Sequence, residues 1–114
     1  MDEGRILHIT TAAEWREAGR RGAYVPAGFA RDGFIHCSRA SQVLRVADFL
    51  FRWQRDLVLL EIDPALAGAP VRTENLEGGK ELFPHLYGPL PVPAVVAVHP
   101  FPCRADGRFD LPLP

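Results

Sequence analysis

The sequence predicts a small α+β domain in which helices come early and strands come late. Apolar residues recur at helical spacing in the first half, at Val43, Val46 and Leu50. Two near-continuous apolar runs, at 57–62 and 94–98, are typical of buried strands. All but one of the 11 prolines follow the first run, so the second half should be extended rather than helical. The expected order β-α-β-α-β-β-β favours α+β over a doubly wound sheet.

Length and composition indicate one ordinary globular domain spanning residues 1–114. The chain has 47% hydrophobic and 24% charged residues, and a protein of this size buries enough surface to fold without a metal or a disulfide. The formal net charge is −1. We therefore expect no general nucleic-acid binding and no membrane-surface binding, since both require a strong positive excess.

The first nine residues do not resemble a signal peptide, and no segment approaches the roughly 20 apolar residues that a membrane span needs. Cys37 and Cys103 form no metal-binding spacing and no disulfide framework. We expect a cytoplasmic protein with two reduced thiols.

In the first half, a strand at 5–9 should lead into a helix that begins at Thr11. Thr11 and Glu14 have the spacing of a capping box, and Gly19 or Gly22 should end the helix. Residues 34–37 read as a short strand after a turn. A second helix should begin at a serine cap, either Ser38 or Ser41, and continue to Trp53.

The second half should contain the buried strand 57–62, a weaker strand at 71–74 and another buried strand at 94–98. Residues 77–80 should form an exposed turn, with Glu77 and Glu81 as surface loop charges. Residues 83–93 should form a loop punctuated by prolines.

Strand alternation predicts a polar cleft. Leu7 and Ile9 should face the core, which turns His8 and Thr10 to the other side. In the second strand, His36 and Ser38 share one face. If the two strands are close, these imidazoles and hydroxyls can bind a ribose or a phosphate, helped by the positive end of the following helix. The alternative is that the two histidines are hydrogen-bonded separately at a sheet edge.

The histidines do not form a recognisable metal motif, so we predict no metal site from spacing alone. A nucleophilic pair of His36 and Cys37 is also disfavoured, because adjacent strand residues point to opposite faces.

The segment 83–90 reads Phe-Pro-His-Leu-Tyr-Gly-Pro-Leu and is dense in chemistry. His85 offers a titratable group, and Tyr87 offers a flat face for stacking on a ring, beside Gly88, where a ligand can approach the backbone. The alternative is that the aromatic residues only anchor a loop.

Several segments together resemble the bacterial domain-of-unknown-function family 952. They are His8-Ile9-Thr10, Trp15, Tyr24 with Pro26, Gly33-Phe34-Ile35-His36-Cys37-Ser38, Gln42, the strand 57–63, Glu74 and the segment 83–90. The resemblance covers residues 5–100 and leaves a C-terminal tail, 101–114.

This family is thought to be similar in fold to the ADP-ribosyltransferases and the related RNA 2′-phosphotransferases. The resemblance implies an ADP-ribosylation-like fold of two small sheets with two helices flanking a cleft that binds NAD. His8 corresponds to the first cofactor-binding position and the His36/Ser38 strand to the second. The usual catalytic carboxylate is missing before the last strand, which leaves Glu74 as the nearest candidate.

The expected function is NAD-dependent transfer or hydrolysis of an ADP-ribosyl or phosphoryl group. The expected catalytic residues are Glu74 and His36. The expected cofactor-binding residues are His8, Thr10, Ser38, His85 and Tyr87. The partner is a small-molecule nucleotide, and the acceptor is not determined. The alternatives are a non-catalytic nucleotide- or metabolite-binding domain on the same cleft and, third, a metal-dependent hydrolase.

Overall fold

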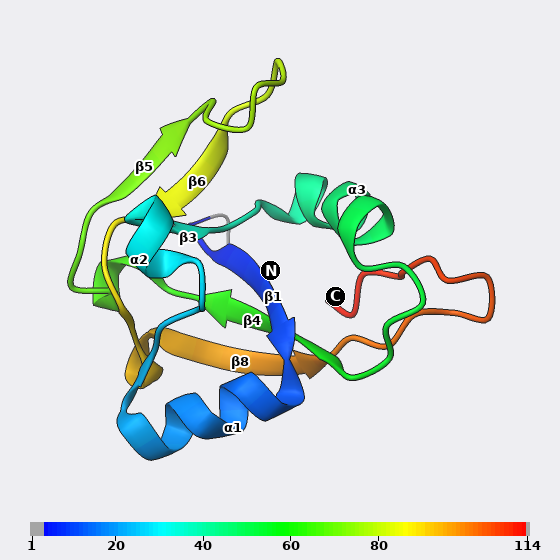
Figure 1. The fold of residues 1–114 in the computed structure, drawn as a ribbon, viewed down its shortest axis with the longest axis horizontal. Helices are drawn as coiled ribbons and strands as arrows, with labels where there is room; N and C mark the ends of the chain where they lie inside the picture. Colours follow the sequence, from blue (N-terminus) through cyan, green and yellow to red (C-terminus); the bar gives the residue numbers. More distant parts are fainter. Residues whose placement is uncertain (1–3, 114) are drawn as a thin grey trace.

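The central strand of the fold is β4 (Leu57–Ile62), which a computed structural model of residues 4–113 places between β1 (Ile6–Thr11) and β8 (Val95–Pro100) in an antiparallel sheet (Figure 1). Four of the six β4 residues are buried, as its apolar run predicts. The prediction that 94–98 is a buried strand is wrong in part. Strand β8 lies at the sheet edge, and its residues alternate between half-buried and exposed.

Both faces of this sheet are covered. Ile6 and Leu60 contribute to one core cluster, together with Ala18 of α1 (Ala12–Arg21). Leu7 and Leu59 contribute to a second cluster with residues of α3 (Ala40–Leu50). Because successive strand residues point to opposite faces, the sheet separates the two clusters. Figure 1 shows α1 and α3 on different sides of the strands.

Helix α1 begins as its sequence predicts. The Thr11 side chain accepts a hydrogen bond from the Glu14 amide at 3.1 Å, and Gly22 closes the helix with φ 85°. The reciprocal half of the capping box is absent from the bonds seen in residues 4–113. The Glu14 carboxylate instead accepts a hydrogen bond from the Thr10 hydroxyl at 3.2 Å.

Helix α3 begins at Ala40, two residues after the predicted Ser38 cap, and Ser41 lies within it. Arg39 occupies the cap position, and the Gln42 side chain accepts a hydrogen bond from the Arg39 amide at 2.9 Å. The helix ends at Leu50 rather than at Trp53. Trp53 has φ 72°, a left-handed conformation that no helix continues through.

The predicted proline-rich loop 83–93 is largely ordered in strands. Strand β6 (Phe83–Leu86) is the middle strand of a second three-stranded sheet, between β3 (Ile35–His36) and β5 (Val71–Glu74). Pro84 has no amide hydrogen to donate, but its carbonyl accepts a hydrogen bond from the Cys37 amide at 3.0 Å. Strand pairing on both sides therefore holds a segment whose prolines suggest a loop.

Short elements complete the chain. Strand β2 (Ala23–Tyr24) pairs with β7 (Leu90–Pro91). Helix α2 (Phe29–Asp32) is a single turn. The chain also forms two 3-10 turns, η1 (Pro64–Leu66) and η2 (Val92–Ala94). The described residues thus form three small antiparallel sheets and three α-helices, an α+β fold, rather than the expected two sheets and two helices. No helix among residues 4–113 is long and apolar enough to cross a membrane.

The two cysteines are free thiols, as the sequence predicts. Both are buried, and Cys37 and Cys103 belong to different core clusters. Burial raises the pKa of the Cys37 thiol to about 12, which keeps it protonated and unreactive near neutral pH.

We expect a thiol reagent at neutral pH to label the native protein slowly, and to titrate two thiols once the protein is denatured without reductant. A denatured thiol count of zero, or rapid labelling of the native protein, would contradict this placement.

Candidate functional site

A pocket of about 700 Å³ opens between α3 and the strands β1 and β3. Three of the four residues predicted to share a cleft, His8, His36 and Ser38, line this pocket, and the fourth, Thr10, does not. The remaining lining is mostly apolar and comes from β1, from β6 and from α3 with the residue after it: Leu7, Ile9, Val46, Phe49, Leu50, Phe51 and Phe83. An apolar cavity with a few convergent polar groups is the usual form of a small-molecule site.

Ser38 is fixed at the junction of two sheets. Its amide donates to the Leu7 carbonyl at 2.8 Å, and its carbonyl accepts from the Leu7 amide at 2.8 Å. The residue is buried and lines the pocket, and its hydroxyl, which makes no side-chain hydrogen bond among residues 4–113, is not one of the buried unpaired atoms of that range. A ligand in the pocket can therefore take this hydroxyl as a donor or an acceptor.

His8 lines the pocket, but both nitrogens of its ring already have hydrogen-bond partners within the protein. Its Nδ1 lies 2.6 Å from the His36 carbonyl, and its Nε2 lies 2.9 Å from the Tyr24 hydroxyl. A carbonyl can only accept, so Nδ1 carries the proton. Burial lowers the pKa of His8 from 6.5 to about 4, so the ring is neutral near pH 7. Neither ring nitrogen is left for a ligand.

Thr10 is not part of the pocket lining. It is buried, and its hydroxyl donates to Glu14 at 3.2 Å and lies 3.1 Å from the Tyr24 hydroxyl, whose single proton can go either to Thr10 or to the unprotonated Nε2 of His8. His8 and Thr10, two positions apart on the same face of β1, thus contact Tyr24, and Thr10 also contacts Glu14. These contacts fix α1 and β2 against β1.

A second group of side chains lies at the edge of the pocket, where strand register brings two histidines together. His36 of β3 is paired directly with His85 of β6, and their ring centroids are 5.8 Å apart. Glu77, from the segment between β5 and β6, places its Oε2 3.0 Å from His36 Nδ1 and 2.9 Å from His85 Nε2. His36 and Glu77 also line the pocket. We call these three residues the His36–Glu77–His85 cluster.

Each histidine of the cluster has a carboxylate near its other nitrogen. Asp32 Oδ2 lies 3.3 Å from His36 Nε2. Arg31 donates to Asp32 and holds the pKa of that carboxyl below its usual value. Glu74 Oε1 lies 3.9 Å from His85 Nδ1, which is fully buried and has no hydrogen-bond partner within the described chain.

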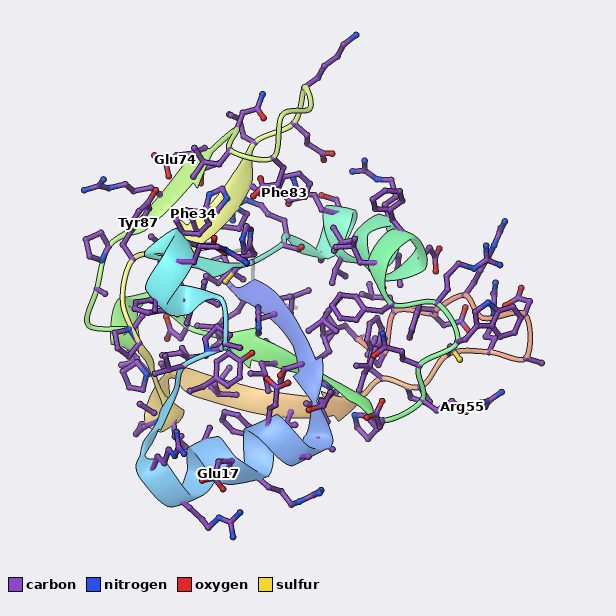
Figure 2. All side chains as sticks on the ribbon, in the orientation of Figure 1. Glu17, Phe34, Arg55, Glu74, Phe83 and Tyr87 are labelled. Carbon is purple, nitrogen blue, oxygen red and sulfur yellow. The ribbon has the colours of Figure 1, made fainter. Side chains whose placement is uncertain are left out.

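Glu74 and Tyr87 lie together, outside the pocket lining. The Tyr87 hydroxyl donates to Glu74 at 2.5 Å, and Arg72 lies over the Tyr87 ring, 4.9 Å from its centroid. Phe34 packs between Tyr87 and the His36–Glu77–His85 cluster, 4.8 Å from both imidazole centroids. Figure 2 shows Glu74, Tyr87 and Phe34 gathered beside β5 and β6, with Phe83 on the side nearer α3. These contacts favour the interpretation that Tyr87 anchors its loop, rather than the one in which it stacks on a ligand ring.

Glu77 is exposed in the loop after β5, as predicted, but sequence reasoning missed its contacts with the two histidines. It joins two histidines that are distant in sequence. The surrounding sequence, Glu-Gly-Gly-Lys, predicts an exposed turn and gives no indication of a contact with a histidine. The reading of Gly88 is wrong. A side chain there would come within 2.7 Å of the Ala69 Cβ, so Gly88 allows loop packing rather than ligand approach.

Comparison with known proteins places the chain in a family. It is similar to protein CC0527 from Caulobacter crescentus. The two sequences are 37% identical, and superposition on the crystal structure of CC0527 gives a TM-score of 0.84 and covers 94% of each chain. A crystal structure of a double mutant of that protein gives a TM-score of 0.83 at the same identity and coverage. Its solution NMR structure gives 0.81, covering 92% of this chain and 90% of that chain.

No curated protein matches the chain. Residues 9–98, which include the whole His36–Glu77–His85 cluster and begin one residue after His8, match one family model. The chain therefore belongs to the family described as "Protein of unknown function (DUF952)".

Proposed function

We propose that the pocket binds a nucleotide-type small molecule, with NAD as the leading candidate. The observation that carries the proposal is the pocket itself, which combines an apolar and aromatic wall with the free hydroxyl of Ser38 and the ring of His36. Its volume of about 700 Å³ is within the range of small-molecule sites. The resemblance to ADP-ribosyltransferases, whose cofactor lies in a cleft between small sheets, supports the same ligand class.

Different lining residues suit the different parts of a nucleotide. Phe49 and Phe83 supply rings against which a base or a nicotinamide can stack. Arg45 also lines the pocket and offers a guanidinium to a phosphate, although it pairs with Glu81 in the absence of ligand. Ser38 is placed to hold a ribose hydroxyl.

We place the chemistry at the His36–Glu77–His85 cluster. Transfer or hydrolysis of an ADP-ribosyl or phosphoryl group requires a carboxylate or an equivalent charged group near the reacting atoms. Glu74 was the candidate in the sequence, but its carboxylate is bonded to Tyr87 away from the pocket. Glu77 lies 3.0 Å from His36 and lines the pocket, which favours an enzyme over a purely binding domain.

A thermal-shift series with NAD, ADP-ribose, AMP and nicotinamide tests the ligand class. A compound present at 100 times its Kd should stabilise the protein by about 2.7 kcal/mol. NAD and ADP-ribose should raise Tm more than nicotinamide does, because they are larger and can contact more of the lining residues.

Val46→Trp should fill the pocket from α3 and weaken binding on the order of 100-fold by steric exclusion. Val96→Trp, at an exposed position of β8, is the matched control and should respond as the parent does. If no compound shifts the parent, or if Val46→Trp responds equally well, the pocket is not the nucleotide site.

A further inference from the structure

We propose that the His36–Glu77–His85 cluster is a binding site for a divalent transition-metal ion of the zinc class. One ligand atom from each residue lies within 4.8 Å of the others. Two imidazole nitrogens and one carboxylate oxygen form a donor set that suits zinc and related ions, whereas magnesium and calcium prefer oxygen ligands alone.

The two distances from the carboxylate to the imidazole nitrogens need only small adjustments to hold an ion, and the two imidazole nitrogens lie within 4.8 Å of each other. Ligand atoms around a tetrahedral zinc ion lie about 3.4 Å apart, since each bond is near 2.1 Å. Glu77 Oε2 lies 3.0 Å from His36 Nδ1 and 2.9 Å from His85 Nε2. Separating the carboxylate from the two rings by a few tenths of an ångström makes room for the ion. Glu77 is on an exposed turn that can supply this movement.

The outer groups favour the tautomers that metal binding requires. An ion on His85 Nε2 moves that ring's proton to Nδ1, which is buried and has no partner within residues 4–113. The nearest carboxylate to Nδ1 is Glu74 at 3.9 Å, and Tyr87 holds that carboxylate in place. Metal binding thus gives an otherwise unpaired buried nitrogen a charged acceptor.

His36 shows the same arrangement. An ion on Nδ1 leaves the proton on Nε2, which faces Asp32 Oδ2 at 3.3 Å. His36 therefore has, within hydrogen-bond distance, the kind of carboxylate that orients metal-binding imidazoles in proteins, and His85 has one 3.9 Å from its Nδ1. This pattern distinguishes the cluster from the other histidine–glutamate pair of the described chain, His99 with Glu61, which has no third ligand.

The position of the ion would couple it to the pocket. His36 and Glu77 line the pocket while His85 is fully buried beneath them, so a fourth coordination position faces the cavity. A water molecule or a ligand oxygen, such as a phosphate oxygen, can occupy that position. The proposal concerns the ion alone and does not depend on the nucleotide.

The test is zinc binding by the full chain after chelator treatment, measured by calorimetric titration without any nucleotide. The expected result is one Zn²⁺ per chain. Co²⁺ in place of zinc should give the intense visible absorption of a tetrahedral site. Glu77→Gln and His36→Ala should each weaken zinc binding by about 100-fold or more. Both side chains are exposed, so circular dichroism should show that these variants fold as the parent does.

Two matched variants make the result decisive. His99→Ala removes the other glutamate-paired histidine and should leave zinc binding unchanged. Glu74→Gln weakens only the outer support of His85 and should lower zinc affinity by roughly 10- to 100-fold while keeping the stoichiometry at one. Absence of stoichiometric binding, or equal loss in His99→Ala and Glu77→Gln, would overturn the metal site. A failed nucleotide screen with intact zinc binding would overturn only the pocket proposal.

Discussion

Phe101→Ala should lower the free energy of unfolding by about 4 kcal/mol, the upper part of the range for truncating a buried aromatic residue. Phe101 is 1% exposed and packs against Phe109, with ring centroids 4.8 Å apart. It belongs to the cluster between the central sheet and α3, where Leu7 and Ile9 also line the pocket. For a domain of this size, the expected fall in Tm is roughly 15 °C.

Denaturant unfolding followed by fluorescence and by circular dichroism measures this change. Phe49→Ala is the matched control, since Phe49 is 85% exposed and its removal should change stability by less than about 0.5 kcal/mol. A loss in Phe101→Ala as small as that of the control would mean that the tail is not part of the core.

Leu60→Ala should cost about 3 kcal/mol, because Leu60 is fully buried in the central strand and its removal leaves a cavity that two neighbouring strands prevent from collapsing. Leu60 pairs with His8 on one side and with Val98 on the other. The variant should therefore also loosen the strand that holds His8 at the pocket.

The control for this prediction is Val98→Ala, at the directly paired position of the edge strand. Val98 is 40% exposed, so its truncation should cost clearly less than that of Leu60. If Leu60→Ala and Val98→Ala lose the same free energy of unfolding in urea, β8 is as deeply packed as β4, which would contradict the burial described above.

These two residues differ in how far the sequence alone reveals them. Leu60 sits in an apolar run of six residues with one charge, and such a run predicts a buried strand wherever it occurs. Phe101 lies beyond the recognised segments, among prolines, in a stretch with no periodic pattern. Its burial depends on Phe109 and on a sheet whose strands are distant in sequence, so no local signal marks it.

Corrections to the strands have the same origin. Pro84 suggests a loop because proline cannot donate a ladder hydrogen bond, yet β6 is held by two neighbouring strands through its remaining groups. The run 94–98 suggests full burial, but an edge position exposes alternate residues of β8. In both cases the deciding factor is the strand order, which local composition does not encode.

The sequence by itself determined the α+β class, the start of α1 at Thr11, its end at Gly22, and the strand faces that bring His36 and Ser38 to one pocket. These features depend on neighbouring residues and on the fixed periods of helices and strands. Only the tertiary structure decided which carboxylate joins the histidines. Glu77 is 41 positions from His36 in sequence. The pairing of β3, β6 and β5 brings the turn that carries Glu77 to both imidazoles. Contacts at that separation follow from strand order and not from local pattern.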